Sequence, residues 1–294
     1  PDRAGAAMSG AAVIGVVGNP NCGKTTLFNA LTGAKQRVGN WPGVTVERKI
    51  GRYVFEGVSF ELVDLPGTYS LEVSDDSVSV DEAIARDYVA AREADLIVNI
   101  VDASNLERNL YLTSQLLEMK VPMVVALNMM DVAEERGIEV DFEQLAKRLG
   151  CPVVPIVAAS GEGAQTLKQT VLEGARAKRA PDVELSYPAD VDRAVESLLP
   201  RIDSAARDAG VDTRWLAVRL LEGDTLALRL AGDAVGDDLE EIRSTTETAL
   251  GDDIDIGLAD ARYGFVSQVT DGAVKRKGEI TRSISDRIDR VVLN

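Results

Sequence analysis

The stretch Gly18-Asn19-Pro20-Asn21-Cys22-Gly23-Lys24-Thr25 decides the fold of this chain. It has the form G-x-x-x-x-G-K-[ST], it follows the apolar run Ala12–Val17, and it precedes the helical pattern Thr25–Leu31. A strand–loop–helix unit of this kind wraps backbone N–H groups around phosphate oxygens at a helix N-terminus. We expect Lys24 to reach the β- and γ-phosphates and the Thr25 hydroxyl to hold Mg²⁺. A glycine-rich turn that matches by chance is the alternative, and the flanking strand and helix argue against it.

A second phosphate-binding element is expected at Asp64-Leu65-Pro66-Gly67, directly after the apolar run Phe60–Val63. Asp64 would bind Mg²⁺ through water, and the Gly67 N–H would meet the γ-phosphate. Asp-x-Pro-Gly also favours a simple turn. The functional interpretation therefore depends on its place, one hairpin after the phosphate loop.

A base-recognition element is expected at Asn128-Met129-Met130-Asp131, which ends the run Met123–Leu127. Ligands of α/β sheets bind beyond the carboxyl ends of the strands. There, Asp131 can accept two hydrogen bonds from guanine N1–H and the 2-amino group, a donor pair that adenine lacks. Asn128 would join this loop to the phosphate loop. Taken alone, Asp131 would be interpreted as a helix cap; combined with the other two motifs it indicates guanine.

Residues 12–177 alternate short β-branched runs with helical patterns, which predicts an α/β fold with a mostly parallel sheet and helices on both faces. The predicted strands are Ala12–Val17, Arg52–Phe55, Ser59–Val63, Leu96–Val101, Met123–Leu127 and Val153–Val157. The predicted helices are Thr25–Leu31, Asp81–Arg92, Leu106–Met119, Asp141–Leu149 and Ala164–Ala177. A tight turn at Glu56-Gly57 would make one edge strand antiparallel.

The segment Lys178–Pro188, with two prolines and mixed charge, is typical of a domain boundary. Beyond it no strand alternation remains, and apolar residues from Val191 to Ile202 recur at helical spacing. We expect a nucleotide-binding domain over residues 11–178 and a small all-α domain over 185–277. A final helix is expected over 278–294, where apolar residues also recur at helical spacing.

Composition excludes several kinds of chemistry. The 294 residues contain no histidine and two cysteines, so histidine bases, histidine metal clusters and a disulfide framework are excluded. The net charge of −16 argues against a nucleic-acid partner. No signal peptide and no stretch of roughly 20 apolar residues is found, so neither secretion nor a membrane span is expected within the sequence.

The three motifs have the order and spacing of TRAFAC-type GTPases, and the residues around them resemble the FeoB family of ferrous-iron transporters. The resemblance is specific over residues 18–29, 39–47 and 64–71. It is weaker at 220–224, 261–263 and 286–290. It implies a GTPase domain followed by a helical domain that slows GDP release and passes the nucleotide state to the transporter's own membrane domain.

The resemblance also implies further site residues. Thr45 would be the switch threonine that meets Mg²⁺ and the γ-phosphate; a plain turn residue after Pro42-Gly43 is the alternative. Asn21 would supply a side-chain ligand to K⁺, with phosphate oxygens and carbonyls of 39–41 completing the shell; the alternative is that Asn21 only shapes the loop. The fifth motif aligns with Val157-Ala158, although Ala159-Ser160 stays open.

The expected site follows from these assignments. The expected catalytic residues are Asn21, Lys24, Thr45 and Gly67, and the expected metal ligands are Thr25, Thr45 and Asp64 for Mg²⁺ and Asn21 for K⁺. The expected contacts to GTP or GDP are Gly18, Asn19, Pro20, Asn21, Cys22, Gly23, Lys24, Thr25, Thr26, Gly43, Val44, Thr45, Asp64, Leu65, Pro66, Gly67, Asn128, Met129, Asp131, Val157 and Ala158.

The motifs thus predict a domain that hydrolyses GTP to GDP and phosphate, and the resemblance implies that it does so at the cytoplasmic face of a membrane, for a ferrous-iron transporter. Hydrolysis should be slow, because Thr68 stands where Ras-like enzymes carry a water-orienting glutamine. A free-standing regulatory GTPase is one rival, although residues 185–294 lack the basic character of an RNA-binding domain. A nucleotide-dependent binding module is another. An ATP-using enzyme is disfavoured by Asp131. Self-association stays open.

Overall fold

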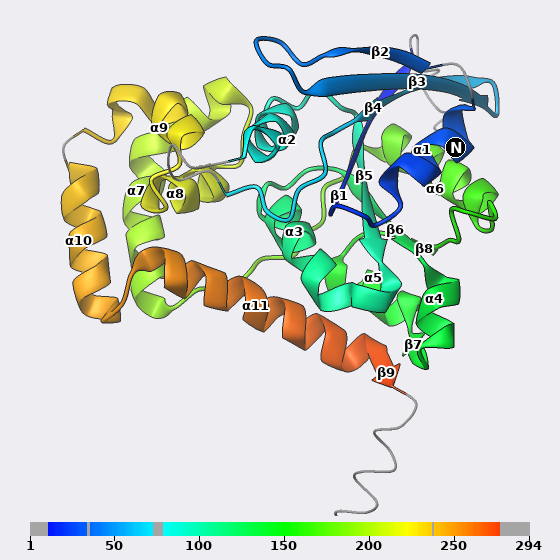
Figure 1. Ribbon diagram of the computed structural model, residues 1–294. Coiled ribbons are helices and arrows are strands. Elements are labelled where there is room, and N and C mark those ends of the chain that lie inside the picture. Colours follow the sequence, from blue (N-terminus) through cyan, green and yellow to red (C-terminus); the bar gives the residue numbers. More distant parts are fainter. Residues whose placement is uncertain (1–10, 34–35, 73–78, 237, 277–294) are drawn as a thin grey trace, which may run out of the picture.

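The computed structural model describes residues 11–33, 36–72, 79–236 and 238–276, which form an α/β part and a helical part side by side (Figure 1). The strands are β1 (Ala12–Gly18), β2 (Gln36–Asn40), β3 (Glu47–Phe55), β4 (Val58–Asp64), β5 (Leu96–Asp102), β6 (Met123–Asn128), β7 (Ile138–Val140), β8 (Val153–Pro155) and β9 (Val274–Arg276). The helices of the α/β part are α1 (Lys24–Thr32), α2 (Val80–Ala90), the 3₁₀ turn η1 (Ala103–Asn105), α3 (Leu106–Glu118), α4 (Met130–Glu135), α5 (Phe142–Leu149) and α6 (Ala164–Ala177). The helical part contains α7 (Ala189–Ala209), α8 (Thr213–Leu221), α9 (Thr225–Ala231), η2 (Gly232–Ala234), α10 (Asp238–Leu250) and α11 (Ile254–Ala273).

The main sheet has the strand order β2-β3-β4-β1-β5-β6-β8 and is mostly parallel, which confirms the predicted fold class. The predicted hairpin joins β3 and β4, with positive φ angles of 49° at Glu56 and 75° at Gly57. Two positive φ angles match the twist of paired strands, which explains the tight turn. β3 is thus the antiparallel strand, and β2, which the sequence analysis did not predict, lies outside it at the edge.

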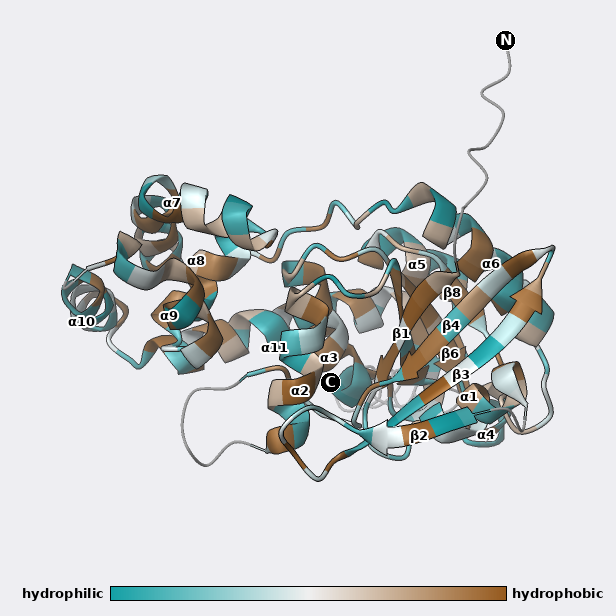
Figure 2. Ribbon diagram, turned by 90° about the horizontal axis from the view of Figure 1, so that it is seen from above, coloured by the Kyte–Doolittle hydropathy of each residue, from teal (hydrophilic) through white to brown (hydrophobic). Residues whose placement is uncertain are grey.

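Each face of the sheet carries its own apolar cluster. On one face, Leu27 and Phe28 of α1 and Leu167 and Val171 of α6 pack against the strands. On the other face, α2, α3 and α5 cover the sheet, and their cluster continues without a break into the helical part. The parallel strands between the faces are nearly continuous apolar runs (Figure 2), as strands buried on both sides should be.

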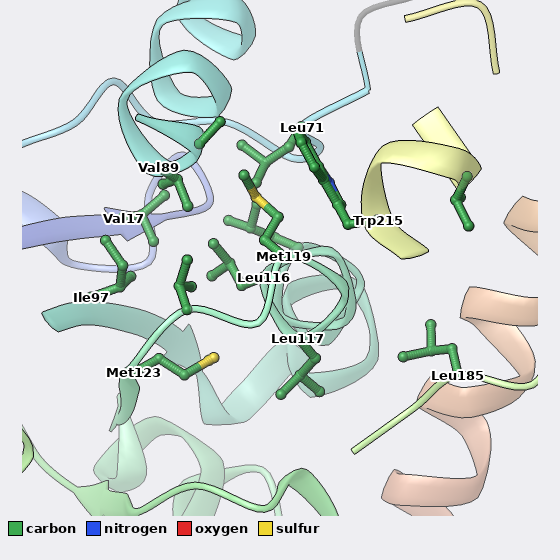
Figure 3. Close-up of a cluster of buried hydrophobic side chains, with 14 of the residues drawn as sticks. Val17, Leu71, Val89, Ile97, Leu116, Leu117, Met119, Met123, Leu185 and Trp215 are labelled. Carbon is green, nitrogen blue, oxygen red and sulfur yellow. The ribbon is translucent and has the colours of Figure 1, made fainter. Parts of the chain in front are cut away.

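The continuous cluster means that the apolar core of the helical part is joined to that of the α/β part. Trp215 of α8 is 2% exposed and lies in one cluster with Leu71 and with Met119, which directly follows α3 (Figure 3). The side chain of Asp212 caps α8 by accepting from the Trp215 N–H at 2.9 Å. Trp215 is therefore a core residue, and that core is shared between the two parts.

Two further strands, β7 and β9, were not predicted from the sequence. β9 follows α11 at the end of the described chain and pairs antiparallel with β7, so a strand does occur beyond Pro188. Three residues are too few for an alternation pattern, which is why periodicity missed both strands. The predicted helix over 278–294 lies outside the described residues. Within the described ranges, no helix is both long and apolar enough to cross a membrane.

Candidate functional site

The phosphate loop Gly18–Thr25 joins β1 to α1 at the carboxyl edge of the sheet. Its shape requires a left-handed backbone conformation at two residues, with φ of 66° at Asn21 and 89° at Gly23. A Cβ at Gly23 would lie 2.2 Å from Nδ2 of Asn128, and one at Gly18 would lie 2.7 Å from the Ile100 carbonyl oxygen. Only glycine fits these two positions, so the loop can close tightly around an anion. Asn21, Thr25 and Thr26 are exposed beside it.

The Asp64–Gly67 segment lies against this loop. The Leu65 N–H donates to the Val16 carbonyl at 3.0 Å, and the Thr68 N–H donates to the Gly18 carbonyl at 3.3 Å. The Lys24 ammonium contacts the Asp64 carboxylate, which is mostly buried. These contacts bring the two predicted phosphate elements together, because β1 and β4 are neighbouring parallel strands.

Asn128 connects three loops through one buried side chain, which is 3% exposed. Its Nδ2 donates to the Cys22 carbonyl at 2.9 Å, as the sequence analysis expected of this residue. Its Oδ1 accepts from the Ala158 N–H, also at 2.9 Å. One end of the amide therefore donates to the phosphate loop while the other end holds the loop after β8.

Asp131 lies in the first turn of α4 and its side chain is exposed. It does not cap the helix, since the N-cap position belongs to Met129, in the left-handed conformation at φ 61°. Nearby, Ala158 is buried against Asn128, whereas Ala159 and Ser160 are exposed in a turn closed by Ser160 N–H to the Val157 carbonyl. Of the two alignments of the fifth motif, this placement favours Val157-Ala158.

The structure does not bring Thr45 to the phosphate loop. Gly43, Val44 and Thr45 lie in the turn between β2 and β3, where the Trp41 N–H donates to the Val46 carbonyl at 2.9 Å. The Thr45 side chain is exposed there. Trp41, in contrast, is buried: the Tyr88 ring lies edge-on to it at 5.6 Å, and the Arg48 guanidinium lies 4.7 Å from its ring centre.

Burial, rather than the nearby helix N-terminus, sets the pKa of the Cys22 thiol. A thiol near a helix N-terminus should have a lowered pKa, but burial of this side chain dominates and raises the pKa of Cys22 to about 11. Lys24 lowers the pKa only in part. At neutral pH the Cys22 side chain is therefore a small apolar group that packs beneath the loop.

A family model described as "Ferrous iron transport protein B" matches residues 12–171, and one described as "FeoB cytosolic helical domain" matches residues 187–275. The chain belongs to the FeoB family. Its α/β part is a P-loop GTPase domain, and the helical part is the family's cytosolic helical domain.

Individual FeoB relatives agree with this assignment. The Fe(2+) transporter FeoB of Escherichia coli (strain K12) is 44% identical over 286 residues, which are 96% of this chain and 36% of that protein. FeoB of Salmonella typhimurium is 43% identical, with the same coverage. The chain thus spans about a third of the length of these curated relatives.

Solved FeoB structures show the same fold. The cytosolic domain of L. pneumophila FeoB is 41% identical with a TM-score of 0.73, covering 90% of this chain and 100% of that one. A mutant of S. thermophilus NFeoB bound to GDP is 36% identical with a TM-score of 0.79 and the same coverage. The T. maritima cytosolic domain in GMPPNP form is 35% identical with a TM-score of 0.77, covering 90% and 99%.

The donor set of this FeoB-family site fits a magnesium nucleotide. The Thr25 hydroxyl and the Asp64 carboxylate are oxygen ligands of the kind that Mg²⁺ prefers, beside a loop whose N–H groups favour phosphate. The sequence analysis assigned no role to several residues that join this site to the helical part. Gln115, Glu118 and Arg86 lie inside ordinary helical patterns, and only their long-range partners distinguish them.

Proposed function

We propose that this chain is the GTP-binding and GTP-hydrolysing regulatory region of a ferrous-iron transporter, at the cytoplasmic face of the membrane. The observation that carries the proposal is the position of Asn128, which holds the phosphate loop and the Ala158 loop together. Asp131 lies one helical turn further along the chain, and its exposed side chain does not cap α4. This arrangement suits a guanine base whose phosphates lie on the Gly18–Thr25 loop. We place the GTPase domain at residues 11–178 and the helical domain at 185–277.

Hydrolysis in this proposal depends on positioning and on fixed charge. Lys24 neutralises the β- and γ-phosphate oxygens, and the Gly67 N–H donates to the γ-phosphate. Thr25 and Asp64 hold Mg²⁺, which neutralises charge on the phosphates when bound. For Thr45 to meet the same group, the turn between β2 and β3 must fold over the phosphate loop. Thr45 would then act only while a γ-phosphate is present.

Asn21 gives the site a place for a monovalent cation. Its side chain is exposed at the mouth of the loop, held there by a positive φ. An amide oxygen suits K⁺, and a fixed positive charge beside the phosphates stabilises the charge that develops during transfer, as an arginine finger does. We therefore include K⁺ stimulation in the proposed activity.

The segment after Gly67 connects the nucleotide to the helical domain. Gln115 of α3 accepts the Leu71 N–H at 2.7 Å, and its Nε2 donates to Ser70 Oγ at 3.0 Å and to Glu72 Oε1 at 2.7 Å. Arg262 of α11 donates to the same Glu72 oxygen at 2.6 Å. A change in the Asp64–Gly67 segment is thereby passed to α11 through the Glu72 carboxylate.

A second contact between the two domains is made by α2, the helix that follows this segment. Arg86 of α2 donates to Asp224 at 2.7 Å, and both side chains are about 2% exposed or less. The other oxygen of Asp224 caps α9 by accepting the Leu226 N–H at 2.8 Å. The buried pair fixes the end of α9 to α2, so that the two domains respond together to the nucleotide.

Salt substitution tests the proposed activity. GTP turnover should be higher in KCl than in NaCl at equal ionic strength, and ATP should not compete. Asn21→Ala should remove the difference between the salts while nucleotide affinity is kept. Equal wild-type rates in the two salts would refute the potassium part alone, and absence of GTP binding would refute the whole proposal.

The domain contact is tested by Glu72→Gln, which removes the charge facing Arg262 without leaving a cavity. Glu107→Gln is the matched control, because Glu107 lines the same surface pocket as Glu72 but is exposed at the start of α3. GDP release should become faster in Glu72→Gln and stay unchanged in Glu107→Gln. Equal release from both variants would show that this carboxylate does not connect the two domains.

A further inference from the structure

The described chain ends in a short two-stranded ribbon beside the guanine-recognition segment. α11 crosses from the helical part to the α/β part and ends in β9, next to β7 and α4 (Figure 1). β9 pairs antiparallel with β7, with Glu139 opposite Lys275 and Val140 opposite Val274. Arg276, the last described residue, therefore lies on this ribbon.

β7 is joined directly to the residues that would read the base. Asp131 lies in α4, and only Arg136 and Gly137 separate the end of that helix from β7. The Gly137 N–H donates to the Glu134 carbonyl at 2.9 Å, which fixes the turn between them. From Asn128 to Val140 the chain runs from the end of β6 through α4 into β7, with at most two residues between successive elements. This stretch begins at Asn128, whose side chain holds the phosphate loop.

Several contacts fasten the end of α11 to this element. The Asp141 N–H donates to the Ala273 carbonyl at 2.7 Å, while the Asp141 side chain caps α5 by accepting the Gln144 N–H at 2.9 Å. Arg148 of α5 donates to the Gln268 carbonyl of α11. The half-buried side chains of Ile138, Val140 and Val274 pack against the larger core.

We propose that the β7–β9 ribbon is a mechanical connection through which the chain beyond Arg276 controls how tightly the guanine loop holds GDP. When β9 is paired, β7 and α4 are held and Asp131 stays beside the base. When β9 is pulled away, α4 loses its support and GDP leaves faster. This inference rests on the proposed function and goes beyond it, because it names a route from the last described strand to the nucleotide.

Because the ribbon is short, the pairing of β9 with β7 can open and close reversibly. A pair of three-residue strands is held by few hydrogen bonds, so it opens at a small cost compared with global unfolding. Coupling between two sites is reciprocal: if pairing of β9 strengthens GDP binding, GDP binding must strengthen pairing of β9 by the same factor. Both directions are measurable on the wild-type chain and one pair of variants.

Lys275→Pro tests the forward direction. Proline removes a backbone N–H from the middle of β9, while Lys275→Ala keeps it and changes only an exposed side chain. Release of fluorescent GDP should be about fivefold faster or more in Lys275→Pro. It should match the wild type in Lys275→Ala. A wild-type release rate in a folded Lys275→Pro protein would overturn the proposal.

Hydrogen exchange on the unmodified protein tests the reverse direction and does not depend on a variant that folds. Saturating GDP should slow exchange of the β9 amides, whereas the β3–β4 turn at Glu56-Gly57 should be unaffected. Equal exchange of β9 with and without GDP would overturn the proposal even though GDP binds. Failure of the wild type to bind GDP at all would instead refute the proposed function.

Discussion

Arg262 of α11 and Glu72 of the segment after Gly67 lie 2.6 Å apart, although 190 residues separate them in the sequence. The Arg262 side chain is 1% exposed and also contacts Glu118 at 2.9 Å and Glu222 at 2.7 Å. The Arg262 guanidinium therefore forms ion pairs with three carboxylates, which come from three different segments of the chain. Together with Gln115 of α3, it makes α11 one of the two helices that hold the segment after Gly67 in place.

Removal of this guanidinium should be costly. Arg262→Ala would leave buried carboxylates without a partner, and we expect a loss of about 3–5 kcal/mol in the free energy of unfolding. Arg193→Ala, which removes an exposed arginine paired with Asp190, should cost less than about 1 kcal/mol. Urea denaturation measures both. Similar losses for the two variants would show that the buried cluster is not important for stability.

Asp131→Asn should weaken GTP binding by about 2–3 kcal/mol, because an amide cannot accept both guanine donors. The same variant should gain relative affinity for xanthine nucleotides, which carry a carbonyl where guanine has its amino group. Fluorescence titration with both nucleotides measures this. Glu135→Gln, in the same short helix, is the control and should leave both affinities unchanged.

Thr45→Ala should keep GDP affinity and slow single-turnover GTP hydrolysis by about 10²-fold, as expected when a contact made only with the γ-phosphate is lost. Because Thr45 is exposed in the turn between β2 and β3, its truncation should leave the fold intact. An equal loss of GDP and GTP affinity would contradict the switch role.

Both cysteines should resist alkylation in the native protein at pH 8. Burial raises the pKa of Cys22 to about 11 and that of Cys151 to about 12, so almost no thiolate exists there. Mass spectrometry after brief treatment with iodoacetamide should find neither cysteine labelled, and both labelled in denaturant. Rapid native labelling of Cys22 would show a reactive thiol in the loop.

Acid should weaken the buried charge cluster around Arg262. Burial by itself would raise the pKa of Glu222, but Arg219 and Arg262 hold it below its ordinary value. The stabilisation from this carboxylate is complete above its unfolded pKa of about 4.3 and is lost as pH falls through the lower folded value. The difference in unfolding free energy between wild type and Glu222→Gln should therefore shrink as pH is lowered from 6 to about 3. A constant difference would contradict the assignment.

The phosphate loop and the strands beside it were predictable because their signals are local. A glycine in the left-handed region, an apolar run and a helical period are properties of neighbouring residues, as in Gly23, β1 and α1. The Glu56-Gly57 turn was predictable for the same reason. The edge strand β2 was missed, because most of its side chains are exposed and it shows no apolar alternation.

By itself, the sequence determined the fold class, the order of the nucleotide motifs and the helical texture beyond Pro188, since each follows from contacts within a few residues. Only the tertiary structure decided that Ala158 faces Asn128, that Arg262 reaches Glu72 and that β9 pairs with β7. Those pairs join residues 30 or more positions apart. Their partners are chosen by the packing of whole helices and strands, which leaves no periodic mark in either segment.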